Sequence, residues 1–184
     1  MDVVTRAKNI LLQPSREWRV IAGESTDVST LLRSYAAPLS GIAALCQWFG
    51  LSVFFGVLGI GFLRTAVTAV VSWALGLLSL WVAAIVIEQL APSFGSRSST
   101  VQALKLVVYA STPVWLVGIL TLVPLLGVLF IVAVTYAVYL FYIGLPRVLD
   151  TPADRVVPYM LTSAVIVILA NVIVRAAARL VAGV

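Results

Sequence analysis

The chain has 184 residues, of which 62% are hydrophobic and only 10% are charged, and its mean hydropathy is +1.12. Soluble globular chains are usually about 45–50% apolar and about 25% charged. A soluble domain of this length could not bury so much apolar surface, so the composition excludes a soluble globular protein. The formal net charge of +5 does not indicate nucleic-acid binding, because the basic residues border apolar runs, as they do in membrane proteins.

The residue types that metal sites and acid–base sites use are scarce in this chain. It has no histidine, and its single cysteine, Cys46, lies inside an apolar run. One cysteine can form neither an intramolecular disulfide nor a cysteine-based zinc site. We therefore expect no catalytic residues, no metal and no cofactor, and we predict that the protein is not an enzyme.

Residues 1–34 form the only long polar segment. Its charges are scattered along its whole length, which is not typical of a cleavable signal peptide. Apolar residues recur at helical spacing from Val3 to Leu11, and Pro14 ends that helix or begins the next one. A second short apolar face follows and carries Trp18. These features predict a basic amphipathic segment in the lipid headgroup region, and the alternative is a solvated tail with ordinary helical turns.

Five apolar runs follow this segment, and a transmembrane helix needs only about 20 apolar residues. The runs cover residues 35–63, 65–91, 101–123, 124–146 and 156–181. The third and fourth runs form a hairpin, because Pro124 and Gly127 favour a turn between them. Pro113 should kink the third helix, and the hydroxyls of Ser111 and Thr112 are near the carbonyls that a kink exposes. The fold class is therefore all-α, a polytopic membrane helix bundle with five transmembrane helices.

Small residues in the first two runs are expected to serve helix packing. Ser72 and Gly76 are four residues apart, a spacing that lets helix backbones approach closely. Gly56, Gly59 and Gly61 resemble a nucleotide-binding loop only superficially, because no strand precedes them. We interpret these glycines as a turn or as a place of close helix packing.

Glu88 is the one acidic residue within an apolar run. An ionisable group inside a membrane is costly, so it should have a partner or reach the interface. Because Glu88 lies near a helix end, we expect it to reach the interface or to pair with Arg97 or Lys105. A role in moving protons or a substrate is the alternative.

A second polar feature lies in the fifth run. Asn171, Arg175 and Arg179 are spaced four apart, which places them on one face of a helix. Two arginines that reach the interface and one interhelical amide would explain the pattern. A groove for lipid phosphate is the alternative. Together with Glu88 these residues are the candidate intramembrane polar or lipid-contact residues.

The distribution of basic residues predicts the topology. Five spans place the termini on opposite sides of the membrane. The N-terminal side then carries nine basic residues: Arg6, Lys8, Arg16, Arg19, Arg33, Arg97, Lys105, Arg147 and Arg155. The other side carries only Arg64, Arg175 and Arg179. Because basic residues favour the cytoplasm, we predict a cytoplasmic N terminus and a C terminus on the other side.

Four segments, taken in order, resemble the Yip1 family in its small bacterial form. They are RAKNILLQPSREW at 6–18, the Gly/Ser loop GSRSS at 95–99, YASTP at 109–113 and YAVYLFYIGLP at 136–146. The loop departs from the family's usual Gly-Gly-Lys-Gly pattern. The resemblance singles out Tyr109, Pro113, Tyr136, Tyr139 and Gly144 as structural determinants of the central hairpin.

The resemblance implies a cytoplasmic amphipathic segment over residues 1–34 and a five-helix transmembrane domain over residues 35–184. It further implies a bacterial inner membrane, with the C terminus in the periplasm. Eukaryotic members of the family are similar to trafficking factors that engage small GTPases through a long cytosolic N-terminal region. This chain shows only the short segment, so we do not expect that activity.

The sequence favours a non-enzymatic integral membrane protein that organises the membrane or partner proteins. The expected partners are the lipid bilayer and a membrane protein or a second copy of the chain, and no nucleic acid. The alternative is a small transporter, channel or lipid scramblase. In that case Gln47 and the four candidate polar residues would line a path between the helices.

Overall fold

The computed structural model describes residues 2–56, 62–97 and 99–182, and within these residues every regular element is helical. Gly59 and Gly61 lie outside the described residues. The elements in chain order are α1 Val3–Leu12, α2 Pro14–Gly23, α3 Val28–Leu31, η1 Leu32–Ala36, α4 Ala37–Gly56, α5 Phe62–Leu90, η2 Ala91–Phe94, α6 Thr100–Ala110, α7 Thr112–Leu120, η3 Pro124–Val128, α8 Leu129–Val148 and α9 Val156–Ala182.

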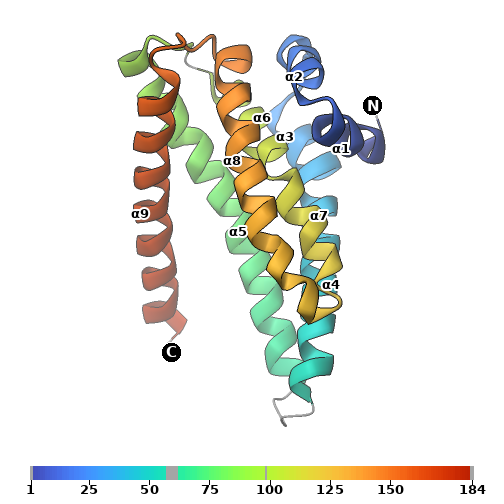
Figure 1. Cartoon of the computed structure of the whole chain (residues 1–184). Coiled ribbons are helices and arrows are strands. Elements are labelled where there is room, and N and C mark those ends of the chain that lie inside the picture. The colour runs from blue at the N-terminus through green and yellow to red at the C-terminus, as the bar shows by residue number, and fades with distance from the viewer. Residues whose placement is uncertain (1, 57–61, 98, 183–184) are drawn as a thin grey trace.

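Five of the described helical segments are long and apolar enough to cross a membrane. The chain runs away from its N-terminal end in α4, returns in α5, leaves again through α6 and α7, returns in α8 and leaves in α9 (Figure 1). The short helices α1 and α2 lie beside the bundle at the end where α8 finishes (Figure 1). The predicted all-α bundle of five transmembrane helices is confirmed.

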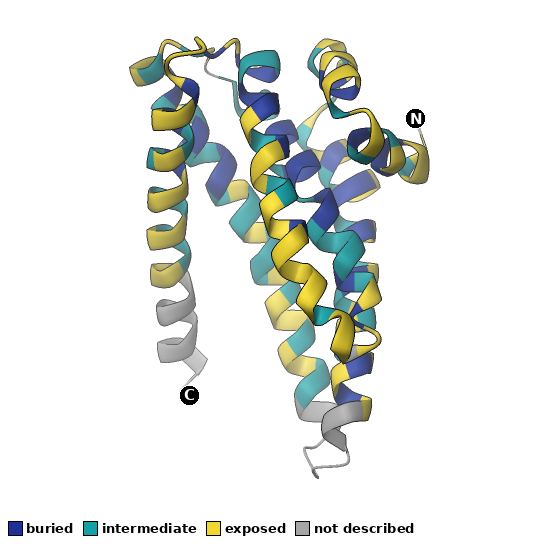
Figure 2. Cartoon of the chain, in the orientation of Figure 1, coloured by how far each residue is buried: buried dark blue, intermediate teal, exposed yellow. Residues whose placement is uncertain are grey.

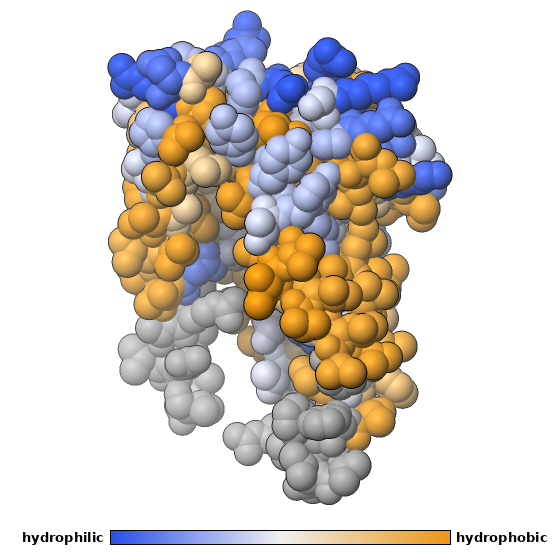
Figure 3. All heavy atoms as spheres, viewed as in Figure 1, coloured by the Kyte–Doolittle hydropathy of each residue, from blue (hydrophilic) through white to orange (hydrophobic). Residues whose placement is uncertain are grey.

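Buried side chains gather at the end of the bundle that carries α1 and α2 (Figure 2). The largest of them include Trp18, Ile10, Leu106 and Leu140, which come from four different helices. Further along the bundle the spans expose large apolar side chains, and Leu125 is 84% exposed. Figure 3 shows the same division, with hydrophilic residues gathered at one end above a hydrophobic surface. This surface has the chemistry that contact with lipid tails requires.

The helix of the first span begins earlier than the apolar run that predicted it. The Asp27 carboxylate accepts hydrogen bonds from the backbone N–H groups of Ser29 and Thr30, each at 3.1 Å. An aspartate in this position caps a helix, so helical structure starts at Val28 and continues through η1 into α4. The hydrogen bonds from Ser29 and Thr30 also hold the pKa of Asp27 well below its usual range.

The third span is broken at the predicted proline. Helix α6 ends at Ala110, α7 begins at Thr112, and Pro113 lies in the first turn of α7. The Ser111 hydroxyl donates to the carbonyl of Val107 at 2.8 Å, which satisfies a group that the break exposes. Both parts of the span pack against α8, but α6 also packs against α5, whereas α7 packs against α4. The predicted kink is confirmed, and it redirects the span from one neighbour to another.

The prediction that Ser72 and Gly76 allow close helix packing is wrong. A Cβ atom on Gly76 would meet no atom within 4 Å. Close packing occurs instead between α4 and α7, where a Cβ on Gly118 would lie 2.9 Å from the Cβ of Ala43. The close crossing is therefore between α7 and α4, and it does not involve α5, the helix that carries Ser72 and Gly76.

The Gly/Ser loop is bound to the loop between α8 and α9. The backbone N–H of Arg97 donates to the carbonyl of Leu149 at 2.8 Å, and the Ser96 hydroxyl donates to that of Thr151 at 2.8 Å. Gly95 adopts a positive φ of 65°, a conformation that favours glycine. These contacts join two loops that are more than 50 residues apart in sequence.

Candidate functional site

The candidate site is the surface on which α1 and α2, hereafter the helical pair, dock against the bundle. Trp18 of α2 is fully buried. Its ring lies edge-on to that of Tyr109 from α6, with the ring centres 6.4 Å apart. A Cβ on Gly144 of α8 would lie 2.9 Å from the Trp18 ring and 2.6 Å from Leu106. Glycine at this position therefore provides the space that the indole occupies.

Arg6 of α1 is buried under the helical pair, with only 3% of its surface exposed. One Nη atom donates to Oε1 of Glu17 at 2.6 Å, and the other donates to the carboxylate of Glu24. The guanidinium also lies over the face of Tyr109, 5.6 Å from the ring centre. Burial disfavours its charge, but the hydrogen bond to Glu24 and the surrounding negative charge outweigh burial and raise the pKa of Arg6. The guanidinium is therefore permanently charged and connects both helices of the pair to α6.

Lys105 of α6 binds the C-terminal end of α2. Its ammonium group donates to the carbonyl of Ile21 at 3.0 Å and to that of Glu24 at 2.5 Å. Nearby, the Gln102 amide donates to the carbonyl of Ala22 at 3.2 Å. The last carbonyls of a helix have no partners within the helix and carry its negative dipole end, so a buried cation is favourable there.

Tyr136 of α8 binds the C-terminal end of α1 in a similar way. Its hydroxyl donates to the carbonyl of Leu11 at 2.7 Å. The end of α2 therefore receives donors from α6, and the end of α1 receives a donor from α8. Apolar contacts are therefore not the only ones that hold the pair. Each helix also accepts hydrogen bonds at the backbone carbonyls of its C-terminal end, and these form only when the helix is in one position.

A column of aromatic rings continues from the docking surface into the bundle. Tyr109 lies 4.8 Å from Tyr35, and Tyr35 lies 6.4 Å from Trp115, measured between ring centres. The hydroxyls of Tyr35 and Thr112 share a hydrogen bond of 2.9 Å at the break in the third span. The break therefore lies directly below the helical pair and is joined to it through Tyr109.

Four of the five predicted hairpin determinants lie at or next to the docking surface. Tyr109, Tyr136 and Gly144 contact the helical pair, and Pro113 lies one helical turn beyond Tyr109. Tyr139 is about half exposed (46%), and its ring centre lies 5.6 Å from that of Tyr136. The roles of these residues remain predictions, but the structure gives each of them a position.

The two predicted polar candidates whose side chains the structure describes, Glu88 and Asn171, each make a local hydrogen bond. Glu88 accepts a hydrogen bond from the hydroxyl of Thr100 at 2.7 Å, close to the loop before α6. Asn171 donates to the carbonyl of Val167 in its own helix at 2.9 Å. The side chains of Arg175 and Arg179 lie outside the described part of the structure. Arg97, expected as a partner of Glu88, pairs with Asp150 at 2.8 Å.

Sequence reasoning missed the charged residues that hold the helical pair. From sequence alone, Arg6 and Lys105 count among the basic residues of the N-terminal side, Lys105 is a candidate partner of Glu88, and Glu17 and Glu24 have no role. The sequence held one signal for their burial: Arg6 is next to Ala7 and Glu17 is next to Trp18, and both neighbours belong to apolar helix faces. Within the described residues no group of histidine, cysteine or acidic side chains is arranged to hold a metal ion.

These features define an integral membrane protein of five transmembrane helices with an N-terminal helical pair docked against one end of the bundle. The family model described as the Yip1 domain matches residues 8–174. The chain therefore belongs to the Yip1 family. Comparison with curated proteins and comparison with solved structures gave no match.

The first prediction concerns the space beside Trp18. Gly144→Ala places a methyl group against the indole and should destabilise the docked state by about 1–3 kcal/mol, because the core there has no room. We expect faster tryptic cleavage after Arg16 and Arg19 of the purified protein, together with a lower melting temperature. Gly76→Ala is the matched control, since its methyl group meets open space. Equal cleavage rates in the two variants would contradict a docking role for Gly144.

The second prediction concerns the buried charge. Arg6→Ala leaves the buried carboxylate of Glu17 without its cation and should destabilise the protein by about 3–5 kcal/mol. The same cleavage assay and a thermal melt measure the effect. Lys8→Ala, which removes an exposed cation from the same helix, should change stability by no more than about 0.5 kcal/mol. A melting temperature of Arg6→Ala equal to that of Lys8→Ala would argue against the assigned role of Arg6.

Proposed function

We propose that this protein is a non-enzymatic integral membrane protein of the bacterial inner membrane that organises the bilayer or membrane-protein partners at the cytoplasmic face. The observation that supports this role is the docked helical pair. Its position is set by the buried Arg6 and by Lys105, so it presents one fixed surface to the membrane. In this proposal residues 1–34 form the cytoplasmic segment and residues 35–184 form the transmembrane domain.

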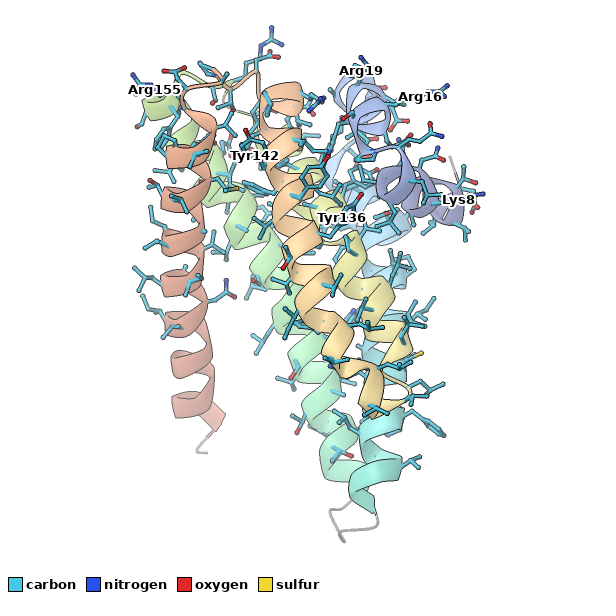
Figure 4. All side chains as sticks on the ribbon, in the orientation of Figure 1. Lys8, Arg16, Arg19, Tyr136, Tyr142 and Arg155 are labelled. Atoms are coloured by element: carbon cyan, nitrogen blue, oxygen red, sulfur yellow. The ribbon has the colours of Figure 1, made fainter. Side chains whose placement is uncertain are left out.

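The outer surface of the helical pair has the composition of an interfacial helix. Val4, Lys8 and Leu12 follow one another at intervals of four on α1, and all three are exposed. A basic residue between two apolar ones suits the boundary between headgroups and acyl chains. Arg16 and Arg19 extend the basic surface onto α2. Figure 4 shows Lys8, Arg16 and Arg19 pointing away from the bundle.

Tyrosines of α8 lie at the same end of the molecule as this basic surface. Tyr136 and Tyr142 lie on α8 further into the bundle than the basic residues of α2, and Arg155 lies at the start of α9 at the same end (Figure 4). Aromatic residues of this kind prefer the membrane interface. We infer that the interface crosses α8 near these tyrosines, which places the helical pair at headgroup level.

The fixed position of the pair favours recognition of anionic lipid. Each basic residue near a negatively charged leaflet contributes about 1 kcal/mol of attraction. A flexible tail would lose conformational freedom on binding, whereas a docked helix has already lost it. The proposed role is therefore to gather anionic headgroups, or a partner that binds them, beside the bundle.

The charge distribution supports the proposed orientation. The nine basic residues whose side chains the structure describes all belong to segments at the end that carries the helical pair. The remaining three are Arg64, Arg175 and Arg179. Since basic residues are retained on the cytoplasmic side, this end is proposed to be cytoplasmic and the C terminus periplasmic.

A transporter or scramblase is the second candidate, and one observation favours it: Gln47 lines a cavity between helices. The hydrogen bonds of Glu88 and Asn171 to nearby groups argue against the path that was predicted from sequence. A lipid-scrambling assay on reconstituted protein with Gln47→Leu tests this candidate. Scrambling by the parent protein that the variant loses would favour it over the organising role.

The third prediction tests the basic surface. The combined variant Lys8→Gln, Arg16→Gln and Arg19→Gln should retain at least tenfold less anionic phospholipid after purification from native membranes in mild detergent, because about 3 kcal/mol of attraction is lost. Lipids and proteins that copurify are both identified. Arg155→Gln is the control, since it removes an exposed charge at the same end but outside the helical pair. Equal recovery of anionic lipid and of partner proteins from the two variants would refute the proposal.

The fourth prediction tests the orientation. In a Cys46→Ser background, a cysteine appended after Val184 should react in intact cells with a maleimide that cannot cross the inner membrane. A cysteine in place of Lys8 should react only after the cells are opened. The reverse pattern would show that the termini are inverted.

A further inference from the structure

A cavity of about 650 Å³ lies between α4, α5 and α7. Its walls include Ser40 and Gln47 of α4, Ser72 and Gly76 of α5, and Trp115 of α7. The break in the third span accounts for the space, because α7 is redirected toward α4 and away from α5. Ser72 and Gly76, which do not support close helix packing, therefore border an opening between spans.

The cavity lies within the membrane. The first span covers Val28–Val53, and Gln47 lies six residues before its end. At about 1.5 Å per residue this is roughly 9 Å along the helix. The hydrocarbon core of a bilayer is about 30 Å thick, and a span of this length exceeds it by only a few residues at each end, so Gln47 lies inside the core.

Most polar groups of the cavity already have partners, but among the described residues the Gln47 amide and the Ser72 hydroxyl have none. The Trp73 indole donates to the Ser40 hydroxyl at 3.0 Å, and Thr65 bonds to Ser52 at 3.2 Å. Gln47 has no hydrogen-bond partner among the described residues. A primary amide in hydrocarbon without a partner is costly, so this group favours a ligand that can hydrogen-bond to it.

The lining determines the charge of that ligand. Among the residues that the structure describes, the side chains around the cavity are hydroxyls, indoles, one amide and apolar groups, and none of these is charged. A phosphate or an ammonium group would have no countercharge among these side chains. The ligand is therefore uncharged, and it has a large apolar part because most of the lining is apolar.

The cavity opens sideways into the bilayer. The lining residues with high exposure mark its mouth, namely Gln47, Leu51, Thr68, Ser72 and Phe130. They belong to spans, so the mouth opens into the hydrocarbon layer. A lipid reaches such a mouth by lateral diffusion, and one of its acyl chains can occupy the cavity while the rest of the molecule stays in the bilayer.

We propose that the cavity binds one neutral lipid with a free hydroxyl, of the diacylglycerol class. Its hydroxyl bonds to the Gln47 amide, and one acyl chain lies against Leu77 and Leu80. The bilayer phospholipids are excluded because their phosphate has no partner in the lining. This site is separate from the docking surface, and its occupancy does not depend on the role proposed for the helical pair.

The test uses the whole protein in vesicles of phosphatidylethanolamine and phosphatidylglycerol that contain a photoactivatable dioleoylglycerol. We expect crosslinks to peptides of α4 and α5. Unlabelled dioleoylglycerol should compete about fivefold better than its 3-O-methyl ether, which keeps both chains but lacks the hydroxyl, because one hydrogen bond is lost. Gln47→Leu should make the two competitors equal.

Ser72→Phe fills the mouth and should reduce crosslinking at least fivefold. Val71→Phe is the matched control, because Val71 is exposed and does not line the cavity. Thermal melts show whether each variant is folded. If Ser72→Phe does not fold, the competition experiment with Gln47→Leu still decides the proposal. Equal crosslinking of the two phenylalanine variants, equal competition by phosphatidylglycerol, or crosslinks between the mouths of two protein copies would each overturn the proposal.

Discussion

The arrangement of the N-terminal helices depends on one buried charge, the guanidinium of Arg6. An unpaired cation in this position would cost several kcal/mol, more than the apolar contacts of a single side chain return. Its partners are Glu17 within α2, Glu24 just after α2, and the face of Tyr109 on α6. The charge is satisfied only when these elements meet in one register. Apolar packing alone would allow the pair to slide along the bundle, so we infer that Arg6 and Lys105 select its position.

The break at Pro113 has two consequences for the rest of the bundle. Above it, the hydroxyl of Thr112 meets that of Tyr35, which fixes the first span beside the third. Below it, α7 crosses α4 so closely that a Cβ atom on Gly118 would clash with that of Ala43, and space opens toward α5. A continuous third helix would run along its α6 neighbours and fill that space. One proline in the span therefore shapes both the support of the docking surface and the cavity.

The spans and the helix boundary at Pro14 were predictable because hydropathy and proline act locally. The resemblance also identified Tyr109, Tyr136 and Gly144, but not the helices that they hold. Those contacts join residues far apart in sequence, such as Lys105 and Ile21. The residue pattern of one helix does not indicate which distant residue that helix contacts. For Ser72 and Gly76 the sequence predicted a close contact that the structure does not have. Small residues at helical spacing allow two helices to approach closely, but the position of the neighbouring helix decides whether they do so or leave a cavity.

The docking surface and the cavity are joined by the aromatic column. Trp18 belongs to the helical pair, Tyr109 and Tyr35 follow it in ring contact, and Trp115 at the far end lines the cavity. Rigid rings in contact cannot shift one at a time without opening voids, and dense interiors resist voids. Tyr109 thus has three simultaneous tasks, since it supports Trp18, faces the Arg6 guanidinium and positions Tyr35 above the break. These demands explain why a tyrosine and a proline four residues later occur together at this point of the chain.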